Sequence, residues 1–157
     1  MLGWLQAIES SGWATWLKES PSIWGYPTLL FLHTVGLAFT VGPSVLIDLR
    51  LLGGGRRLPL APFASFFKIV WIAFAISAAS GAVLFFSDAT AKLENPAYLV
   101  KMTLVVIAVA ITVAIRRHAF GPGTVGGEGA KATRWLAVAS VLCWFGAITA
   151  GRYIAYF

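Results

Sequence analysis

Uncharged, mainly apolar stretches alternate with short polar connections along the whole chain. Four such runs contain no Asp, Glu, Lys or Arg, and they span residues 20–47, 69–87, 102–115 and 135–151. A helix needs about 20 mainly apolar residues to cross the roughly 30 Å of bilayer hydrocarbon. The pattern therefore predicts four transmembrane helices, near residues 27–48, 66–87, 97–117 and 134–153.

The third run is too short to cross the bilayer unaided. It has 14 residues, and at about 1.5 Å per residue these reach only about 21 Å. Lys101 and Arg116, which flank the run, must therefore lie within the third span. Their side chains either extend to the two interfaces or point into the bundle. Pro96, which follows Asn95, is well placed to begin this helix.

The first 20 residues form a separate N-terminal segment. Trp4 lies on one apolar helical face, and Trp13 and Trp16 lie on a second one after a Ser-Ser-Gly break. Tryptophan prefers the boundary between membrane and water. We expect residues 1–20 to form short amphipathic helices in the outer interface, followed by a four-helix transmembrane domain over residues 21–157.

Composition narrows the class of protein. Of the 157 residues, 59% are hydrophobic and 11% are charged, and the mean hydropathy is +0.81. Both a soluble domain, which has about a quarter charged residues, and a disordered chain are excluded. The single cysteine, Cys143, excludes a disulfide framework and a cysteine-based zinc site. We expect an all-α integral membrane protein: an antiparallel four-helix transmembrane bundle with an N-terminal interfacial amphipathic helix.

Lys and Arg are unevenly distributed between the two sides of this predicted bundle. Residues 49–68 and 116–134 hold eight of them, and the other side holds four. Cytoplasmic loops carry the excess of basic residues in membrane proteins, so both termini should face away from the cytoplasm. The net charge of +6 indicates contact with anionic membrane lipids. Nothing resembles a nucleic-acid-binding module, and no nucleic-acid partner is expected.

The first span carries a polar or small stripe along one face. Four residues fall within about 60° of His33 around the helix: Gly36, Thr40, Ser44 and Asp48. Because polar groups facing lipid cost free energy, this stripe should face inward. It is either a packing seam with hydrogen bonds between helices or the wall of a ligand pocket. The pocket interpretation supposes that the stripe lacks protein partners, which would leave room for a cofactor, a quinone, a lipid headgroup or water.

A polar cluster is expected at the outer end of the bundle. Antiparallel helices bring four side chains to a similar depth there: His33, Lys101, Met102 and Arg152. Such a cluster suits an anionic headgroup, a haem propionate or a quinone carbonyl, and with Thr40 and Ser44 it forms the candidate cofactor-binding set. The alternative is that His33 is hydrogen-bonded to a neighbouring backbone and binds nothing.

Haem b is one cofactor that this outer cluster could hold. His33 and Met102 could ligate one iron, as His/Met pairs do in four-helix cytochromes. His118 lies at the opposite end, roughly a bilayer away, so both histidines cannot ligate the same haem. Copper could use His33 and Met102 together with Cys143, although Cys143 lies in mid-span and is interpreted as a small packing residue.

Asp48 ends the polar stripe on the cytoplasmic side, close to several basic residues. We expect a structural ion pair between Asp48 and Arg50, Arg116 or Arg117. The alternative is a proton relay, for which a single carboxylate is poorly suited.

Small residues recur every four positions in two of the spans. They are Ala73, Ser77 and Gly81 in the second span, and Ala139, Cys143, Ala147 and Gly151 in the fourth. Such spacing predicts tight helix contacts, either within the bundle or with a partner helix.

Four motifs resemble those of an uncharacterised bacterial four-transmembrane-helix family, a domain of unknown function. They are LHTVGLA (32–38), IDLRLLG (47–53), NPAYLVK (95–101) and AGRYIAYF (150–157). The third is also similar, more loosely, to the membrane part of copper-resistance protein D. The resemblance implies a multi-pass protein of the bacterial inner membrane. It marks five residues for testing: His33, Asp48, Arg50, Lys101 and Arg152.

Three classes of function are compatible with these features. The first is an accessory or redox (electron-transfer) subunit that binds haem or quinone near the extracytoplasmic leaflet and serves a larger membrane complex or an extracytoplasmic oxidoreductase. The second is a copper-resistance-like transport or metal-homeostasis protein, and the third is a structural membrane anchor. Nothing resembles a nucleophile–base pair, a phosphate loop or a metalloprotease motif, so catalysis by this chain alone is not expected. We rank the first class highest, because a transporter would carry more intramembrane charge.

Overall fold

The computed structural model describes residues 3–19, 21–55, 57–121 and 128–156, and the regular secondary structure of this part of the chain is all helical. Four of its helices are long and apolar enough to cross a membrane, which confirms the predicted all-α four-helix bundle. The helical segments are α1 (Gly3–Glu9), α2 (Gly12–Glu19), α3 (Tyr26–Leu51), the 3₁₀ turn η1 (Ala61–Ser65), α4 (Phe66–Phe86), α5 (Ala89–Glu94), α6 (Pro96–Phe120), α7 (Glu128–Tyr153) and the 3₁₀ turn η2 (Ile154–Tyr156).

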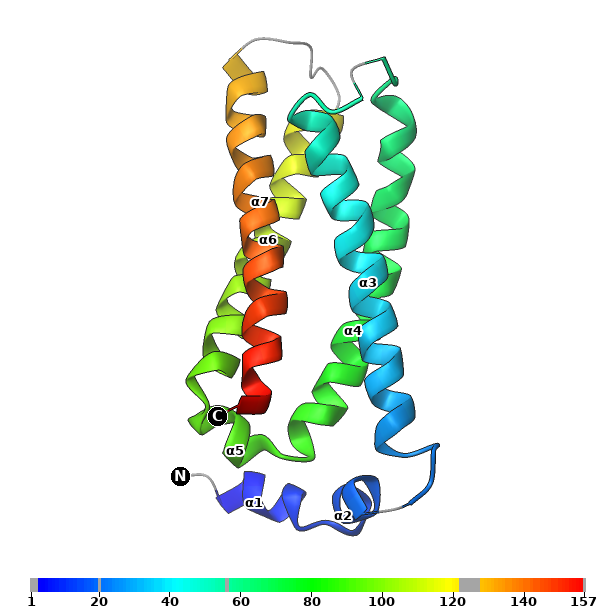
Figure 1. Ribbon diagram of the computed structural model, residues 1–157, viewed down its shortest axis with the longest axis vertical. Helices are drawn as coiled ribbons and strands as arrows, with labels where there is room; N and C mark the ends of the chain where they lie inside the picture. Colours follow the sequence, from blue (N-terminus) through cyan, green and yellow to red (C-terminus); the bar gives the residue numbers. More distant parts are fainter. Residues whose placement is uncertain (1–2, 20, 56, 122–127, 157) are drawn as a thin grey trace.

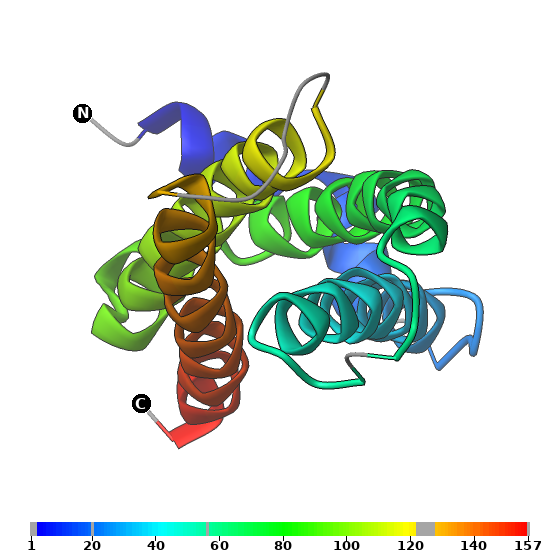
Figure 2. The ribbon, with the colours of Figure 1, turned by 90° about the horizontal axis from the view of Figure 1, so that it is seen from above.

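The four long helices run up and down, and the bundle has two distinct ends (Figure 1). We call the end that holds α1, α2, α5 and the end of α7 the terminal end. The opposite end, where residues 52–65 connect α3 to α4, is the loop end. Seen along the bundle, α3 lies beside α4 and α6 beside α7, and the two pairs meet between α3 and α7 (Figure 2).

Local sequence explains where two of these helices end or begin. After α3, Gly53 adopts a φ of 108°, a conformation that glycine enters without steric cost, and the chain turns back towards α4. The side chain of Asn95 caps α6, because its Oδ1 accepts hydrogen bonds from the N–H groups of Ala97 (2.9 Å) and Tyr98 (3.4 Å). Pro96 is the first residue of α6, as its position after Asn95 predicts.

Helices α3 and α4 approach until their backbones touch. A Cβ added to Gly36 would lie 2.9 Å from the backbone N of Ser77 and 3.0 Å from the backbone O of Ala73. No side chain fits there, so glycine permits this approach. The small residues predicted to form a seam in the second span therefore pack against α3, within the bundle.

The apolar core lies in the middle of the bundle and towards the loop end. One cluster of buried residues joins Val41, Ala108 and Trp144, and a second joins Ile47, Phe67 and Ile115. These clusters draw on α3, α4, α6 and α7 and hold the two helix pairs together. Relative to His33, both lie towards the loop end.

The outward faces of the long helices are strongly apolar. Phe31, Val106 and Leu142 are each about two-thirds exposed, at 66%, 64% and 66%. Monomeric soluble proteins rarely expose apolar patches of such extent, whereas lipid tails cover them without cost. This surface is that of a multi-pass membrane protein.

The N-terminal helices lie across the terminal end (Figure 1) and are tied to α5. The Glu9 carboxylate accepts hydrogen bonds from the backbone N (2.5 Å) and Oγ1 (2.8 Å) of Thr90. These bonds lower the pKa of Glu9 below its ordinary value of 4.5. Lys18 of α2 forms a salt bridge of 3.5 Å with Asp88. Leu5 and Leu17 are buried beneath the bundle, while Trp4 is 60% exposed.

Candidate functional site

The His33 side chain packs closely between α3 and α4. Its Nδ1 lies 2.8 Å from the backbone O of Ser77. The Ser77 hydroxyl in turn donates a hydrogen bond to the backbone O of His33 at 3.2 Å. A Cβ at Gly81 would come within 2.9 Å of the ring, so the imidazole uses the space that this glycine leaves. We call His33, Gly36, Ser77 and Gly81 the His33 seam.

The bond to Ser77 determines which ring nitrogen of His33 is available. A backbone carbonyl only accepts hydrogen bonds, so Nδ1 must carry the hydrogen. In the neutral ring, Nε2 is then left as an acceptor or a metal ligand, an arrangement that proteins use to orient functional histidines. The ring is half-buried. His33 therefore presents a single oriented acceptor in the part of α3 nearer the terminal end.

Lys101 points into the bundle at a similar depth. Its side chain lies over Gly151 of α7, where an added Cβ would be 3.5 Å from Lys101 Cδ and 3.6 Å from Nζ. The residue is half-buried, and its positive charge lies within electrostatic range of His33. Lys101 is thus directed to its neighbours rather than to lipid, as the short third span predicts.

Two other members of the expected outer cluster, Met102 and Arg152, do not point into the bundle beside Lys101. Met102 is 41% exposed on α6, and Arg152 is exposed on α7. Met102 follows Lys101 by one residue, or about 100° around the helix, so when Lys101 faces α7, Met102 faces outward. The expected pairing of His33 with Met102 as metal ligands gains no support from this arrangement and stays a prediction. Within the described residues, no three His, Cys, Asp or Glu side chains gather into a metal site.

Thr40 and Ser44 are buried, but they do not lack partners. The Thr40 hydroxyl donates to the backbone O of Gly36, and the Ser44 hydroxyl donates to the backbone O of Thr40, each at 2.7 Å. Hydroxyls inside helices commonly bond to the carbonyl four residues earlier. The expectation that this stripe needs a non-protein partner is therefore wrong, and these two residues serve the packing seam.

Asp48 does not form the expected ion pair. Arg50 lies about 200° further around α3, and its Nε (3.0 Å) and NH2 (2.6 Å) donate to the backbone O of Leu58. Arg116 is exposed on α6. Among the residues that the structure describes, the only salt bridge joins Lys18 and Asp88. Asp48 is nevertheless 1% exposed.

Asp48 instead faces a polar seam on α7 that the sequence did not reveal. Ser140 lies beside the carboxyl group, and Trp144 follows one turn later. All three are 1% exposed. In the described part of the chain, Asp48 Oδ2, Ser140 Oγ and Trp144 Nε1 are buried without a hydrogen-bond partner. Ser140 and Trp144 lie four residues apart on α7 and so share one helical face, which was the available signal. We call these three residues the Asp48 seam.

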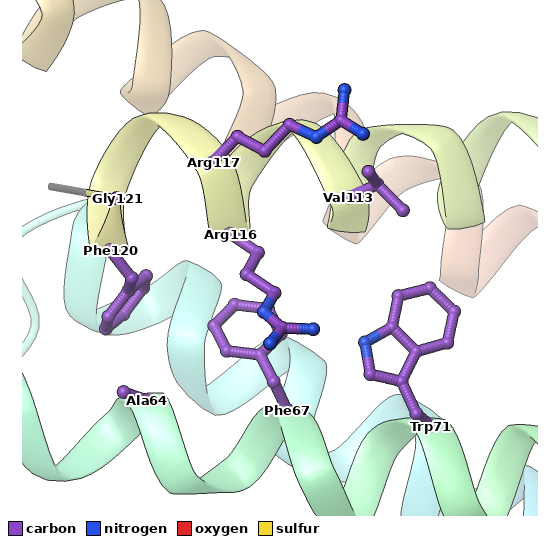
Figure 3. A pocket seen from close by; sticks show the side chains of 8 residues that line it. All are labelled: Ala64, Phe67, Trp71, Val113, Arg116, Arg117, Phe120 and Gly121. Carbon is purple, nitrogen blue, oxygen red and sulfur yellow. The ribbon is translucent and has the colours of Figure 1, made fainter.

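A pocket opens at the loop end between α4 and α6 (Figure 3). It has a volume of about 490 Å³. Phe67 and Phe120 meet edge to face beside it, with ring centroids 5.2 Å apart. The Arg116 guanidinium points towards Phe67 and Trp71, whereas Arg117 points away. Because apolar residues of separate spans form most of its wall, sequence reasoning missed this pocket.

No protein-family model matches this chain, and no curated protein or solved structure is significantly similar to it. The resemblance to the four-helix family and to copper-resistance protein D therefore stays a prediction.

Proposed function

We propose that this protein is an accessory redox subunit of a membrane that binds a quinone headgroup at the terminal end of its bundle. The observation that carries the proposal is the bond of 2.8 Å between His33 Nδ1 and the Ser77 carbonyl. It orients the ring and leaves Nε2 as an acceptor. An oriented acceptor is what a site for a small polar headgroup requires.

Lys101 supplies the complementary donor. Its side chain lies over Gly151 of α7, with Nζ 3.6 Å from the position of an added Cβ, and the residue is half-buried. In the proposed site, Lys101 Nζ donates to a carbonyl oxygen of the quinone, and His33 Nε2 accepts from a hydroxyl of the quinol. The apolar outer faces of the helices suit the isoprenoid tail.

Quinone fits these residues better than haem. Met102 and His118 are both exposed on α6, His118 near the loop end, so in the described part of the chain neither of them is placed to complete axial ligation with His33. A copper site fits less well for the same reason.

The proposed orientation places the terminal end outside the cytoplasm of a bacterial inner membrane, because the loop end holds the larger share of Lys and Arg. A quinone bound there would exchange electrons with a larger membrane complex or an extracytoplasmic oxidoreductase. This chain supplies the binding groups and leaves the redox centre to its partner.

The test uses two substitutions that separate the ring nitrogens. The His33→Asn amide can still donate to the Ser77 carbonyl but has no group at the position of Nε2. The longer His33→Gln side chain reaches the Nε2 position and gives up the bond to Ser77. Binding of a short-chain ubiquinone to protein in nanodiscs is measured by quenching of tryptophan fluorescence, and thermal unfolding is measured in parallel.

We expect His33→Asn to keep its thermal stability and to bind quinone about tenfold more weakly. His33→Gln should retain more of the binding and lose more stability. If both variants bind quinone as the unsubstituted protein does, the proposal is wrong and His33 serves helix packing alone. A Soret band in the purified protein would instead establish haem.

A further inference from the structure

The pocket between α4 and α6 at the loop end is independent of the His33 site. Its eight lining residues, drawn in Figure 3, are Ala64, Phe67, Trp71, Val113, Arg116, Arg117, Phe120 and Gly121. None of these is acidic. The wall is therefore aromatic and aliphatic, with positive charge at one side.

Arg116 gives the pocket its directed charge. Its guanidinium extends towards α4 and lies beside the rings of Phe67 and Trp71, while Arg117 extends to the other side of α6 (Figure 3). Within the described residues neither arginine forms a salt bridge. A guanidinium offers planar paired donors that match phosphate oxygens. Arg116 is thus poised to bind an anion that enters the pocket.

Trp71 adds an unused donor to the same space. Its Nε1 is buried and has no hydrogen-bond partner in the part of the chain that the structure describes. In Figure 3 this nitrogen faces the Arg116 guanidinium. Two donors that face each other cannot satisfy one another, so the arrangement calls for a guest with several acceptor oxygens.

We propose that this pocket binds an anionic phospholipid, with the phosphate held by Arg116 and Trp71 and the start of an acyl chain against Phe67 and Val113. The pocket lies between two membrane-spanning helices, at the end of the bundle richer in Lys and Arg. Basic pockets in this position are known to hold acidic headgroups. The aromatic wall favours a lipid over a free phosphate ion, because a phosphate ion has no apolar part to pack against it.

Neighbouring arginines provide a matched test. Arg116→Gln and Arg117→Gln each remove one charge from the same turn of α6. Both residues line the pocket, but only the Arg116 guanidinium points into it, whereas that of Arg117 points away (Figure 3). Each protein is reconstituted with equal amounts of phosphatidylglycerol and phosphatidylcholine and then exchanged into detergent. The lipid that remains bound is identified by native mass spectrometry, and thermal unfolding shows whether each variant is folded.

We expect the unsubstituted protein to retain one phosphatidylglycerol molecule. The amount of phosphatidylglycerol retained should fall about tenfold in Arg116→Gln and less than about twofold in Arg117→Gln. Trp71→Phe keeps a ring and removes the donor, so its retention should be intermediate. If Arg116→Gln does not fold, Arg116→Lys takes its place; it keeps the charge, loses the paired donors and should also be intermediate.

Three outcomes would overturn the proposal. One is equal loss in the two glutamine variants, which would indicate general surface charge. Another is retention of phosphatidylcholine to the same extent as phosphatidylglycerol. The third is displacement of the lipid by millimolar inorganic phosphate, which would make this a site for free anions. None of these results bears on quinone binding at His33.

Discussion

The His33 seam and the Asp48 seam each contain residues of the same polar stripe of α3, but they differ in whether their buried polar groups are hydrogen-bonded. At the His33 seam, the imidazole and the Ser77 hydroxyl bond to backbone carbonyls of the facing helix. At the Asp48 seam, one carboxyl oxygen, a hydroxyl and an indole nitrogen are each buried without a hydrogen-bond partner among the described residues. The first is a completed contact between helices, whereas the second has hydrogen-bonding capacity left over.

The difference follows from how closely the helices approach. Gly36 lets α3 and α4 meet backbone to backbone, and Gly81 leaves room for the His33 ring, so the imidazole and the Ser77 hydroxyl reach carbonyls across the interface. Between α3 and α7 the large Trp144 side chain packs against Val41, and within the described residues Asp48 Oδ2 and Ser140 Oγ reach no hydrogen-bond partner. Polar residues on one face of a helix can therefore stabilise one helix interface and destabilise the next one.

The largest effect is expected where the His33 seam is tightest. Gly36→Ala should destabilise the protein by about 3 kcal/mol, because its Cβ would press on the backbone of α4 at 2.9 Å. Gly42→Ala is the matched control, since nothing lies within 4 Å of a Cβ there and it lies on the same helix. The free energy of unfolding in mixed micelles measures both. Equal stabilities would show that α3 and α4 are not in backbone contact.

Smaller changes in the free energy of unfolding, of opposite sign at the two seams, are expected when Asp48 or His33 is replaced by leucine. Asp48→Leu removes an unpartnered buried carboxyl and should stabilise the protein by about 1–2 kcal/mol. His33→Leu removes a satisfied hydrogen bond and should destabilise it by about 1 kcal/mol. Unfolding in mixed micelles again gives the values. A loss of stability in Asp48→Leu would mean that the Asp48 seam is satisfied by a bound species.

The smallest effect concerns a third polar contact, the one between Glu9 and Thr90 at the water-facing terminal end. Hydrogen bonds from Thr90 lower the pKa of Glu9 below 4.5. Its contribution to docking α1 on α5 is therefore complete above pH 4.5 and is lost as the pH falls through the lower folded-state value.

Spin labels at Gln6→Cys and Ala91→Cys in a Cys143→Ser background report this docking by pulsed electron paramagnetic resonance. We expect a narrow distance distribution at pH 6 that broadens towards pH 3. With Glu9→Ala added, the distribution should be broad at both values. A distribution that stays narrow in that variant would show that Leu5 and Leu17 hold the N-terminal helices without Glu9.

Much of the architecture was predictable because the bilayer imposes simple rules. Runs of about 20 apolar residues must be helices there, and the predicted spans match α3, α4, α6 and α7 closely. The small-residue spacing of Ala73, Ser77 and Gly81 correctly predicted a tight contact. For Lys101, the short span left two directions open, the interface and the bundle, and the structure has its side chain over Gly151 of α7.

The partners of the polar side chains were much harder to predict. The wheel positions of Thr40 and Ser44 showed which face they occupy, but the carbonyls they bond to belong to their own helix. Three arginines were expected near Asp48, Arg50 by its place in the sequence and Arg116 and Arg117 by their depth in the bundle. In the part of the chain that the structure describes, Asp48 forms an ion pair with none of them. Met102, next to Lys101 in sequence, faces the opposite surroundings because of a rotation of about 100°.

The sequence by itself determined the number, length and apolar character of the helices, since these follow from local composition and the thickness of the membrane. Only the tertiary structure decided which atoms of different helices meet. That depends on the rotation and separation of the helices, set by residues such as Gly36 and Trp144 that touch across the bundle. The oriented Nε2 of His33, the unpartnered Asp48 seam and the pocket under Arg116 all arise at that level.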